Sequence, residues 1–175
     1  MLPPSQNLEL KALDSSPARS LRVCHELKAE DGGLLMQQDT YFKVPHGRLK
    51  LRRESSAPAQ LIAYERADRS DARESLYRIT QVVDATETEA ILGAALGVEV
   101  QVSKQRRIFL LENVRIHLDL VADLGSFIEL EALAGRSAPA DLGVKLTELR
   151  EAFQIEDCDL VSGSYGDLKL AVSSC

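Results

Sequence analysis

Five short segments of the chain place charged or polar residues at every second position, and these residues could do chemistry. The first is Asn7-Leu8-Glu9-Leu10-Lys11, and the others carry Arg48/Lys50/Arg52, Lys104/Arg106, Arg115/His117/Asp119 and Glu129/Glu131. Because successive side chains of a strand point to opposite faces, each segment predicts a strand with its charges on one face. We interpret these faces as converging on the inside of one β-barrel.

Basic and acidic side chains on such an inner surface suit different ligands. Lysines and arginines that approach from several strands would form a cage for a polyphosphate rather than for a single carboxylate. The carboxylates of Glu9, Asp119, Glu129 and Glu131 suit a hard cation, Mg²⁺ or Mn²⁺. Together they predict a triphosphate–metal site, in which the cation would bridge phosphate oxygens and neutralise charge on the leaving group.

Each motif also has a simpler interpretation. A lone Arg-x-Lys-x-Arg or Glu-x-Glu strand is more often a solvated sheet face than a binding site. His117 by itself is more typical of a hydrogen-bonded core or surface residue than of a ligand. The occurrence of the pattern on five segments favours a shared interior over five separate surfaces.

The elements that must position these residues are strands with a few helices inserted between them. Strands are expected at residues 7–11, 34–43, 48–53, 60–66, 76–83, 98–111, 114–121 and 127–134. Helices are expected at residues 17–29, 86–96 and 138–153, with a short one at 164–170. Ser16 and Pro17 predict the start of the first helix, Thr86 and Glu89 a capping box at the second, and residues 67–75 a mobile loop.

This order predicts one α+β domain over residues 1–175, an eight-stranded antiparallel β-barrel that forms a tunnel, with helices packed outside. Leu and Ile residues alternate with the charges and would face these helices. The charged faces would then point inward, where charges removed from water must be paired. Internal carboxylates can pair some of the basic residues, and the remaining positive charge predicts a bound polyanion.

Composition excludes several other classes of protein. The chain has a net charge of −6 and no Trp, which argues against nucleic-acid binding. It has no apolar run of about 20 residues and no signal-peptide pattern, so no membrane association is expected. Three widely spaced cysteines match no metal-ligand spacing and favour a reduced, cytoplasmic location, with Cys24 expected in the core.

Taken in order, the motifs resemble the CYTH domain, also called the triphosphate tunnel metalloenzyme family, over essentially the whole chain. The motifs that carry the resemblance are Asn7-Leu-Glu9-Leu-Lys11, Gln38-Asp-Thr-Tyr-Phe42, Gly47-Arg-Leu-Lys-Leu-Arg52, Lys104-Gln-Arg106-Arg107, His117-Leu-Asp119, Leu124-Gly-Ser-Phe-Ile-Glu129-Leu-Glu131 and Ser164-Tyr-Gly-Asp-Leu168. Gly47–Arg52, Tyr64-Glu65-Arg66 and Leu76-Tyr77-Arg78-Ile79 are most similar to the class IV adenylyl cyclase branch.

The resemblance implies roles for individual residues. The phosphate-binding residues would be Lys11, Arg48, Lys50, Arg52, Arg78, Lys104, Arg106 and Arg115, and the metal ligands Glu9, Asp119, Glu129 and Glu131. Lys11, Arg52, Arg106 and Asp119 would be catalytic. Whether Glu65 or Arg66 faces the tunnel is left open. A homodimer is expected from the resemblance alone.

One departure from the family concerns Asn7, which stands where the opening Glu-x-Glu-x-Lys motif has its first Glu. Asn keeps an oxygen ligand but lacks the charge, so weaker metal binding is expected. Three functions follow. The chain could convert ATP to cyclic AMP and pyrophosphate, hydrolyse thiamine triphosphate or inorganic tripolyphosphate, or bind a nucleotide or polyphosphate without turnover.

Overall fold

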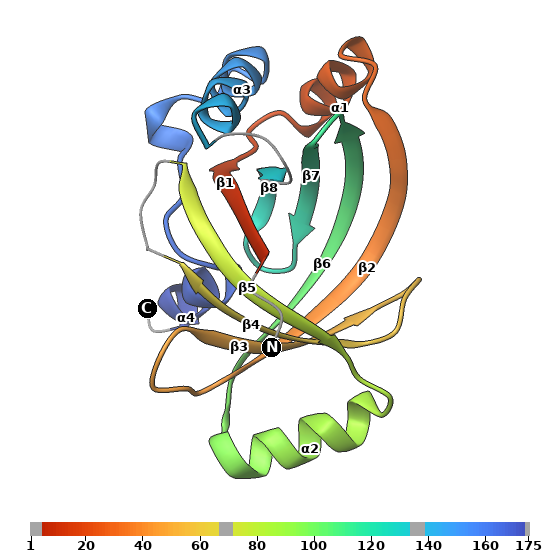
Figure 1. Cartoon of the computed structure of the whole chain (residues 1–175), viewed down its shortest axis with the longest axis vertical. Helices are drawn as coiled ribbons and strands as arrows, with labels where there is room; N and C mark the ends of the chain where they lie inside the picture. Colours follow the sequence, from red (N-terminus) through yellow and green to blue (C-terminus); the bar gives the residue numbers. More distant parts are fainter. Residues whose placement is uncertain (1–4, 67–71, 134–138, 174–175) are drawn as a thin grey trace.

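A computed structural model describes residues 5–66, 72–133 and 139–173 of the chain (Figure 1). The strands are β1 (Ser5–Leu13), β2 (Glu30–Phe42), β3 (Arg48–Glu54), β4 (Gln60–Arg66), β5 (Arg73–Gln81), β6 (Val98–Leu111), β7 (Val114–Val121) and β8 (Gly125–Leu133). The helices are α1 (Pro17–Glu26), α2 (Ala85–Leu96), α3 (Pro139–Ala152) and α4 (Tyr165–Ser173), with a 3₁₀ turn at Asp157–Asp159.

These strands form a closed antiparallel barrel in the order β1-β5-β4-β3-β2-β6-β7-β8, which returns to β1. The closure confirms the predicted eight-stranded barrel with helices outside it. Residues that face each other across two neighbouring strands lie on the same side of the sheet. The register therefore decides which side chains line the interior.

The outer face of β1, β7 and β8 carries the main hydrophobic core. Ile116, Ile128 and Leu130 are buried there and belong to one cluster with the apolar side of α3. That side consists of Leu142, Leu146, Leu149 and Phe153, as the helical spacing predicted. Cys24 of α1 joins the same cluster, which confirms its expected place in the core.

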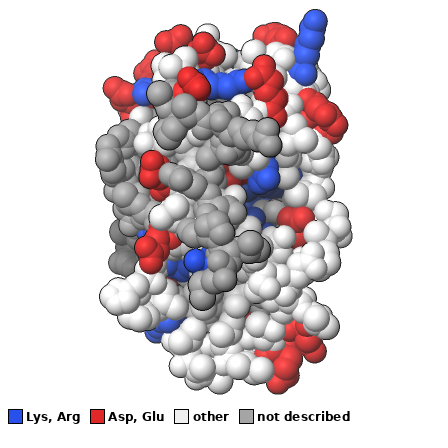
Figure 2. All heavy atoms as spheres, in the orientation of Figure 1, with Lys and Arg blue, Asp and Glu red and all other residues white. Residues whose placement is uncertain are grey.

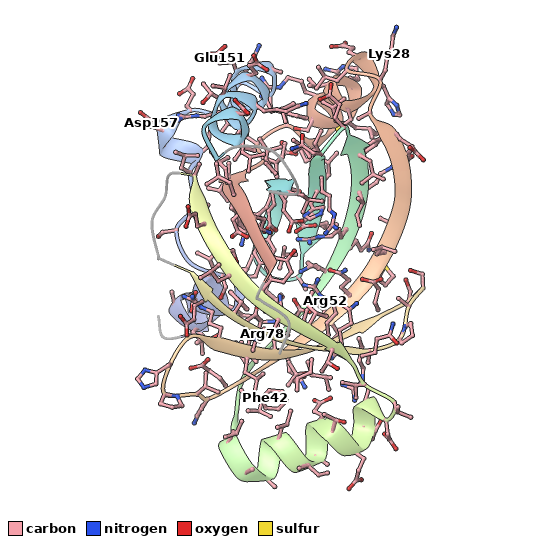
Figure 3. All side chains as sticks on the ribbon, viewed as in Figure 1. Lys28, Phe42, Arg52, Arg78, Glu151 and Asp157 are labelled. Carbon is pink, nitrogen blue, oxygen red and sulfur yellow. The ribbon has the colours of Figure 1, made fainter. Side chains whose placement is uncertain are left out.

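Helix α2 covers a different part of the barrel. Phe42 of β2 lies between the barrel and α2 (Figure 3) and is fully buried, as is Leu51 of β3. Asp84, rather than the predicted Thr86, caps this helix, because its carboxylate accepts hydrogen bonds from the backbone N–H groups of Thr86 and Glu87. Glu89 instead binds Arg53 at the sheet surface.

The C-terminal helix α4 closes a smaller cluster inside the barrel. Tyr165 at its start packs with Tyr41, Val102, Val121 and Phe127, which project from β2, β6, β7 and β8. This cluster fills the interior beside α4 with apolar and aromatic side chains and leaves the charged side chains further along the barrel.

Some predicted boundaries differ from the structure. Strand β5 begins at Arg73, three residues before the predicted start, and ends at Gln81 rather than Val83. Residues 67–71 of the predicted mobile loop lie outside the described part of the chain. Among the helices that the structure describes, none is both long and apolar enough to cross a bilayer.

Candidate functional site

The barrel encloses a cavity of about 610 Å³, lined by side chains from all eight described strands and from the start of α4. Lysine and arginine atoms are visible in a recess near the middle of the face shown in Figure 2, with acidic atoms close to them. The predicted convergence of charged strand faces on one interior is therefore present. The cavity is the candidate site.

Asp39 of β2 is the centre of the basic part of the cavity. Arg52 of β3 donates to both carboxylate oxygens, with distances of 2.7 Å from Nε to Oδ1 and 2.8 Å from Nη2 to Oδ2. The Nζ atoms of Lys50 and Lys104 lie 3.0 and 3.4 Å from Oδ2. Three cations from β3 and β6 thus share one carboxylate, so this region carries an excess of positive charge.

Burial and this excess of positive charge shift the pKa values of Lys50, Lys104 and Asp39. Burial and the nearby Arg52 guanidinium lower the pKa of Lys50 to about 8. Burial also lowers the pKa of Lys104 well below its usual value, and Arg106 and Arg52 add to this effect. Burial alone would raise the pKa of Asp39, but the three cations hold it well below its usual value. An added anion would relieve the repulsion among these cations.

Arg106 of β6 connects the basic part of the cavity to the acidic part. Its guanidinium binds Asp119 through Nε and Nη2, at 2.7 and 2.5 Å, and Glu129 through Nη2, at 2.8 Å. Tyr165 donates its hydroxyl to Asp119 at 2.7 Å. Asp119 is buried and does not line the cavity, because its oxygens face Arg106 and Tyr165. This placement argues against Asp119 as a direct metal ligand and favours a role in positioning Arg106.

Tyr165 also holds two of the lysines. The Nζ atoms of Lys11 and Lys104 lie 4.0 and 5.2 Å from the centre of its ring. Cations at this distance are attracted to the negative face of an aromatic ring. Helix α4 therefore orients ammonium groups that come from β1 and β6.

The acidic part of the cavity lies on β1 and β8. In the register of these strands, Glu9 is opposite Glu131 and Lys11 is opposite Glu129. All four side chains line the cavity, as predicted. Burial and the neighbouring Glu129 raise the pKa of Glu131, which indicates that its charge is incompletely compensated. A cation bound beside it would supply the missing compensation.

Asn7 completes this acidic part. Its side-chain amide donates to Glu131, while its Oδ1 atom is buried and has no hydrogen-bond partner among the described residues. An unpaired buried oxygen beside carboxylates suits a hard cation such as Mg²⁺ or Mn²⁺. No three His, Cys, Asp or Glu side chains in the described residues already form a metal centre. The donors therefore fit the predicted cation in their chemistry without forming a preassembled site.

His117 lies in the same region, opposite Glu129 on β8. Burial and the nearby Arg106 guanidinium lower its pKa to about 3, so the imidazole is neutral near pH 7. Its Nδ1 atom has no hydrogen-bond partner within the described part of the chain. His117 is thus a neutral cavity residue rather than an additional cation.

Two predicted phosphate ligands have other positions. Arg78 is exposed, and its neighbours Tyr77 and Ile79 line the cavity, so Arg78 projects from the outer face of β5. The structure therefore does not bring Arg78 to the cavity. Arg48 forms an ion pair with Asp167 of α4 at 2.8 Å and does not line the cavity. Its placement indicates that it anchors α4.

Arg115, in contrast, lines the cavity with a side chain that is 44% exposed, and its Nη1 atom lies 3.4 Å from Oε2 of Glu131.

The structure answers in part whether Glu65 or Arg66 of β4 faces the cavity. Glu65 pairs with Leu76 and is exposed on the outer face. The backbone of Arg66 pairs with Ser75, and its side chain lies outside what the structure describes.

The sequence patterns do not predict Asp39, Tyr165 or the tyrosines of β2, β4 and β5 as site residues. Asp39 and Tyr165 occur only within family motifs. Alternation along β2 could have identified Asp39, since this residue, Gln37 and Tyr41 all line or border the cavity. Tyr165 carries no such signal, because it lies at the start of a helix.

Replacing Asp39 with Asn should destabilise the protein by about 3–5 kcal/mol, because the buried Lys104 and the partly buried Lys50 and Arg52 lose their shared counter-charge. Inorganic tripolyphosphate should restore part of this loss. Urea denaturation with and without tripolyphosphate measures both effects. The control is Asp31→Asn, which removes the partner of Arg107 at the surface and should cost less than about 1 kcal/mol. An Asp39→Asn variant as stable as the wild type would contradict the central role of this carboxylate.

Affinity for tripolyphosphate should depend on the protonation of Lys50. In the free protein the Lys50 ammonium loses its proton as pH rises through about 8, so binding above that pH requires proton uptake. Below about pH 7 the group is already charged and has no further effect. Titration calorimetry between about pH 6.5 and pH 9.5 measures the dissociation constant of the wild type and of Lys50→Arg.

Arginine stays charged over this range, and the ligand's own titration is common to both proteins. The dissociation constant of the wild type, divided by that of Lys50→Arg, should therefore increase as the pH rises above about 8. A ratio that does not change with pH would show that Lys50 does not contact the anion.

Comparison with known proteins identifies the family. A family model described as the CYTH domain matches residues 5–165. The PH1012 protein of Pyrococcus horikoshii is 22% identical, with a TM-score of 0.84 over 93% of this chain and 98% of that one. A protein of Vibrio parahaemolyticus described as a candidate adenylate cyclase is 18% identical, with a TM-score of 0.79 over 95% and 99% of the two chains.

A Bacillus halodurans protein with the same description is 15% identical, with a TM-score of 0.60 over 94% and 97% of the two chains. At these identities the solved structures show a shared fold. A search of curated protein sequences found no match. Because the family model covers most of the chain and the closed barrel carries the charged interior that the motifs predicted, the chain belongs to the CYTH domain family.

Proposed function

We propose that the protein is a metal-dependent enzyme that acts on an organic triphosphate bound inside the barrel, with ATP as the first candidate substrate. The observation that carries this proposal is the group of three cations, Lys104 buried and Lys50 and Arg52 partly buried, around the single carboxylate of Asp39. The carboxylates of β1 and β8 line the same cavity. A triphosphate with a bound cation would complement both parts at once.

Five basic residues would hold the phosphate chain: Lys11, Lys50, Arg52, Lys104 and Arg106. They come from β1, β3 and β6, so they can surround a chain of phosphates from several sides. Arg115 would add a contact to the phosphate chain at the solvent-exposed part of the cavity. Asp119 would act indirectly, since it fixes the Arg106 guanidinium through two hydrogen bonds.

Glu9, Glu129 and Glu131 would hold Mg²⁺ or Mn²⁺, with the Oδ1 atom of Asn7 as a neutral fourth donor. Such a cation neutralises charge that develops on phosphate oxygens. Loss of one carboxylate at position 7 would weaken its binding. We therefore expect the enzyme to require a higher cation concentration than a relative with Glu at that position.

In the cyclase reaction, the ribose 3′-hydroxyl oxygen attacks the α-phosphorus and the bond to the β-phosphate oxygen breaks, releasing pyrophosphate. Lys11, Arg52 and Arg106 would stabilise the charge that moves onto the leaving group. The descriptions of the Vibrio and Bacillus fold neighbours favour this reaction. Hydrolysis of thiamine triphosphate or tripolyphosphate would use the same cage, with water attacking the terminal phosphate.

A binding module without turnover is the third candidate, and Asn7 is the observation that favours it. A donor set that lacks one charge could retain a ligand while failing to hold its cation firmly. The expected homodimer and the expected reduced, cytoplasmic location stay predictions.

A substrate panel tests these candidates. The protein should be incubated with ATP, thiamine triphosphate and tripolyphosphate, each with Mg²⁺ or Mn²⁺, and phosphate, pyrophosphate and cyclic AMP measured. Cyclic AMP together with pyrophosphate is the expected result. Phosphate release without cyclic AMP would identify a phosphohydrolase. Thermal stabilisation by triphosphates without any product would identify a binding module, and no effect of any triphosphate would refute the proposal.

Two arginines provide a matched pair for the cage. Arg52→Gln should weaken triphosphate binding by about 1.5–3 kcal/mol, because it removes a charge-assisted contact inside the cavity. Arg78→Gln removes the same charge from the outer face and should leave the affinity unchanged within about twofold. Titration calorimetry measures both. Equal losses in the two variants would mean that the charge of the whole molecule, and not the cage, sets the affinity.

A further inference from the structure

One wall of the cavity differs from the others in its chemistry. Six of the eight strands place at least one charged side chain in or beside the cavity. The described side chains that line it from β4 and β5 are all uncharged: Gln60, Ile62, Tyr64, Ser75, Tyr77 and Ile79. Leu35 of β2 and Ile108 and Leu110 of β6 also line the cavity, but they share those strands with charged side chains. Among the described side chains, only those of β4 and β5 bring no charge to the cavity or its border.

The apolar members of this wall form one continuous patch. Ile62 lies opposite Ile79 and Tyr64 lies opposite Tyr77, so the four residues make two adjacent cross-strand pairs. Side chains in such pairs are in contact range. We call these four residues the β4–β5 patch.

The β4–β5 patch borders the basic cage directly. Lys50 lies opposite Ile62 in the register of β3 and β4. Its Nζ atom is 5.6 Å from the centre of the Tyr64 ring. A ligand whose phosphates bind Lys50 would therefore have its remaining part within reach of the patch.

The patch also extends toward solvent. Ile62 is buried, whereas Ile79 is 49% exposed although it lines the cavity. Inorganic tripolyphosphate is charged along its whole length and has no apolar group that could pack against such a surface. A flat heteroaromatic ring could bury it by stacking and by apolar contact.

We propose that the β4–β5 patch binds the organic group of the substrate and that this group is a heteroaromatic ring joined to the triphosphate. The inference rests on the proposed function, because the phosphates must occupy the cage for the ring to reach the patch. On this assignment, contacts with the β4–β5 patch make the protein bind organic triphosphates in preference to tripolyphosphate. Tyr77 and Ile79 are then specificity residues, while the lysines and arginines serve every triphosphate alike.

The test compares ligands that share the phosphate chain. Titration calorimetry with Mg²⁺ measures the binding of inorganic tripolyphosphate, thiamine triphosphate and α,β-methylene ATP, whose α–β link cannot be broken. Tyr77→Ala and Ile79→Ala should each weaken at least one organic triphosphate about tenfold. They should change tripolyphosphate affinity less than about twofold. The ligand that shows the selective loss identifies the ring.

Two further variants separate binding from folding. Thr80→Ala alters the exposed neighbour of Ile79 and should affect no ligand, and Tyr77→Phe keeps the ring and should keep the affinity. Equal losses for tripolyphosphate and both organic ligands, or no loss for any of them, would overturn the assignment of the patch. If the wild type binds no triphosphate at all, the proposed function fails and the patch assignment fails with it.

Discussion

Pairing of charges inside a closed barrel is the constraint on which the rest of the structure depends. Closure removes the inner side chains from bulk water, and each buried charge then needs a partner. Asp39 meets this need for Arg52, Lys50 and Lys104 together. One carboxylate for three cations is enough to hold them in place but leaves them partly uncompensated. The fold thus retains a surplus of positive charge where a ligand can reach it.

The interior is also divided. Cations from β3 and β6 surround Asp39, whereas Glu9 and Glu131 lie together across β1 and β8. Arg106 lies between the two parts and pairs with acids of β7 and β8. This division is what distinguishes a site for a metal-bound polyphosphate from a simple anion pocket. It requires strands from opposite ends of the sequence to meet, as β1 does with β8.

Period-two alternation was sufficient to predict which faces point inward on most strands, because Leu and Ile mark the outer face there. Alternation gave no such prediction for β5, where the family resemblance alone placed Arg78 among the phosphate ligands; there Tyr77 and Ile79 face the cavity and Arg78 faces outward. The assumption that apolar means outward does not hold for a wall that is itself partly apolar. Partners across strands, such as Asp39 with Arg52, depend on the register, which alternation within one strand does not contain. The cap at Asp84 was missed because two overlapping cap signals lie within three residues of each other.

Helix α4 has a consequence for shortened forms of the chain. The ring of Tyr165 lies against the ammonium groups of Lys11 and Lys104, and its hydroxyl binds Asp119. A chain shortened after β8 would keep the eight strands but lack this ring. The arrangement of the cavity lysines therefore depends on a residue more than 150 positions after Lys11 in the sequence.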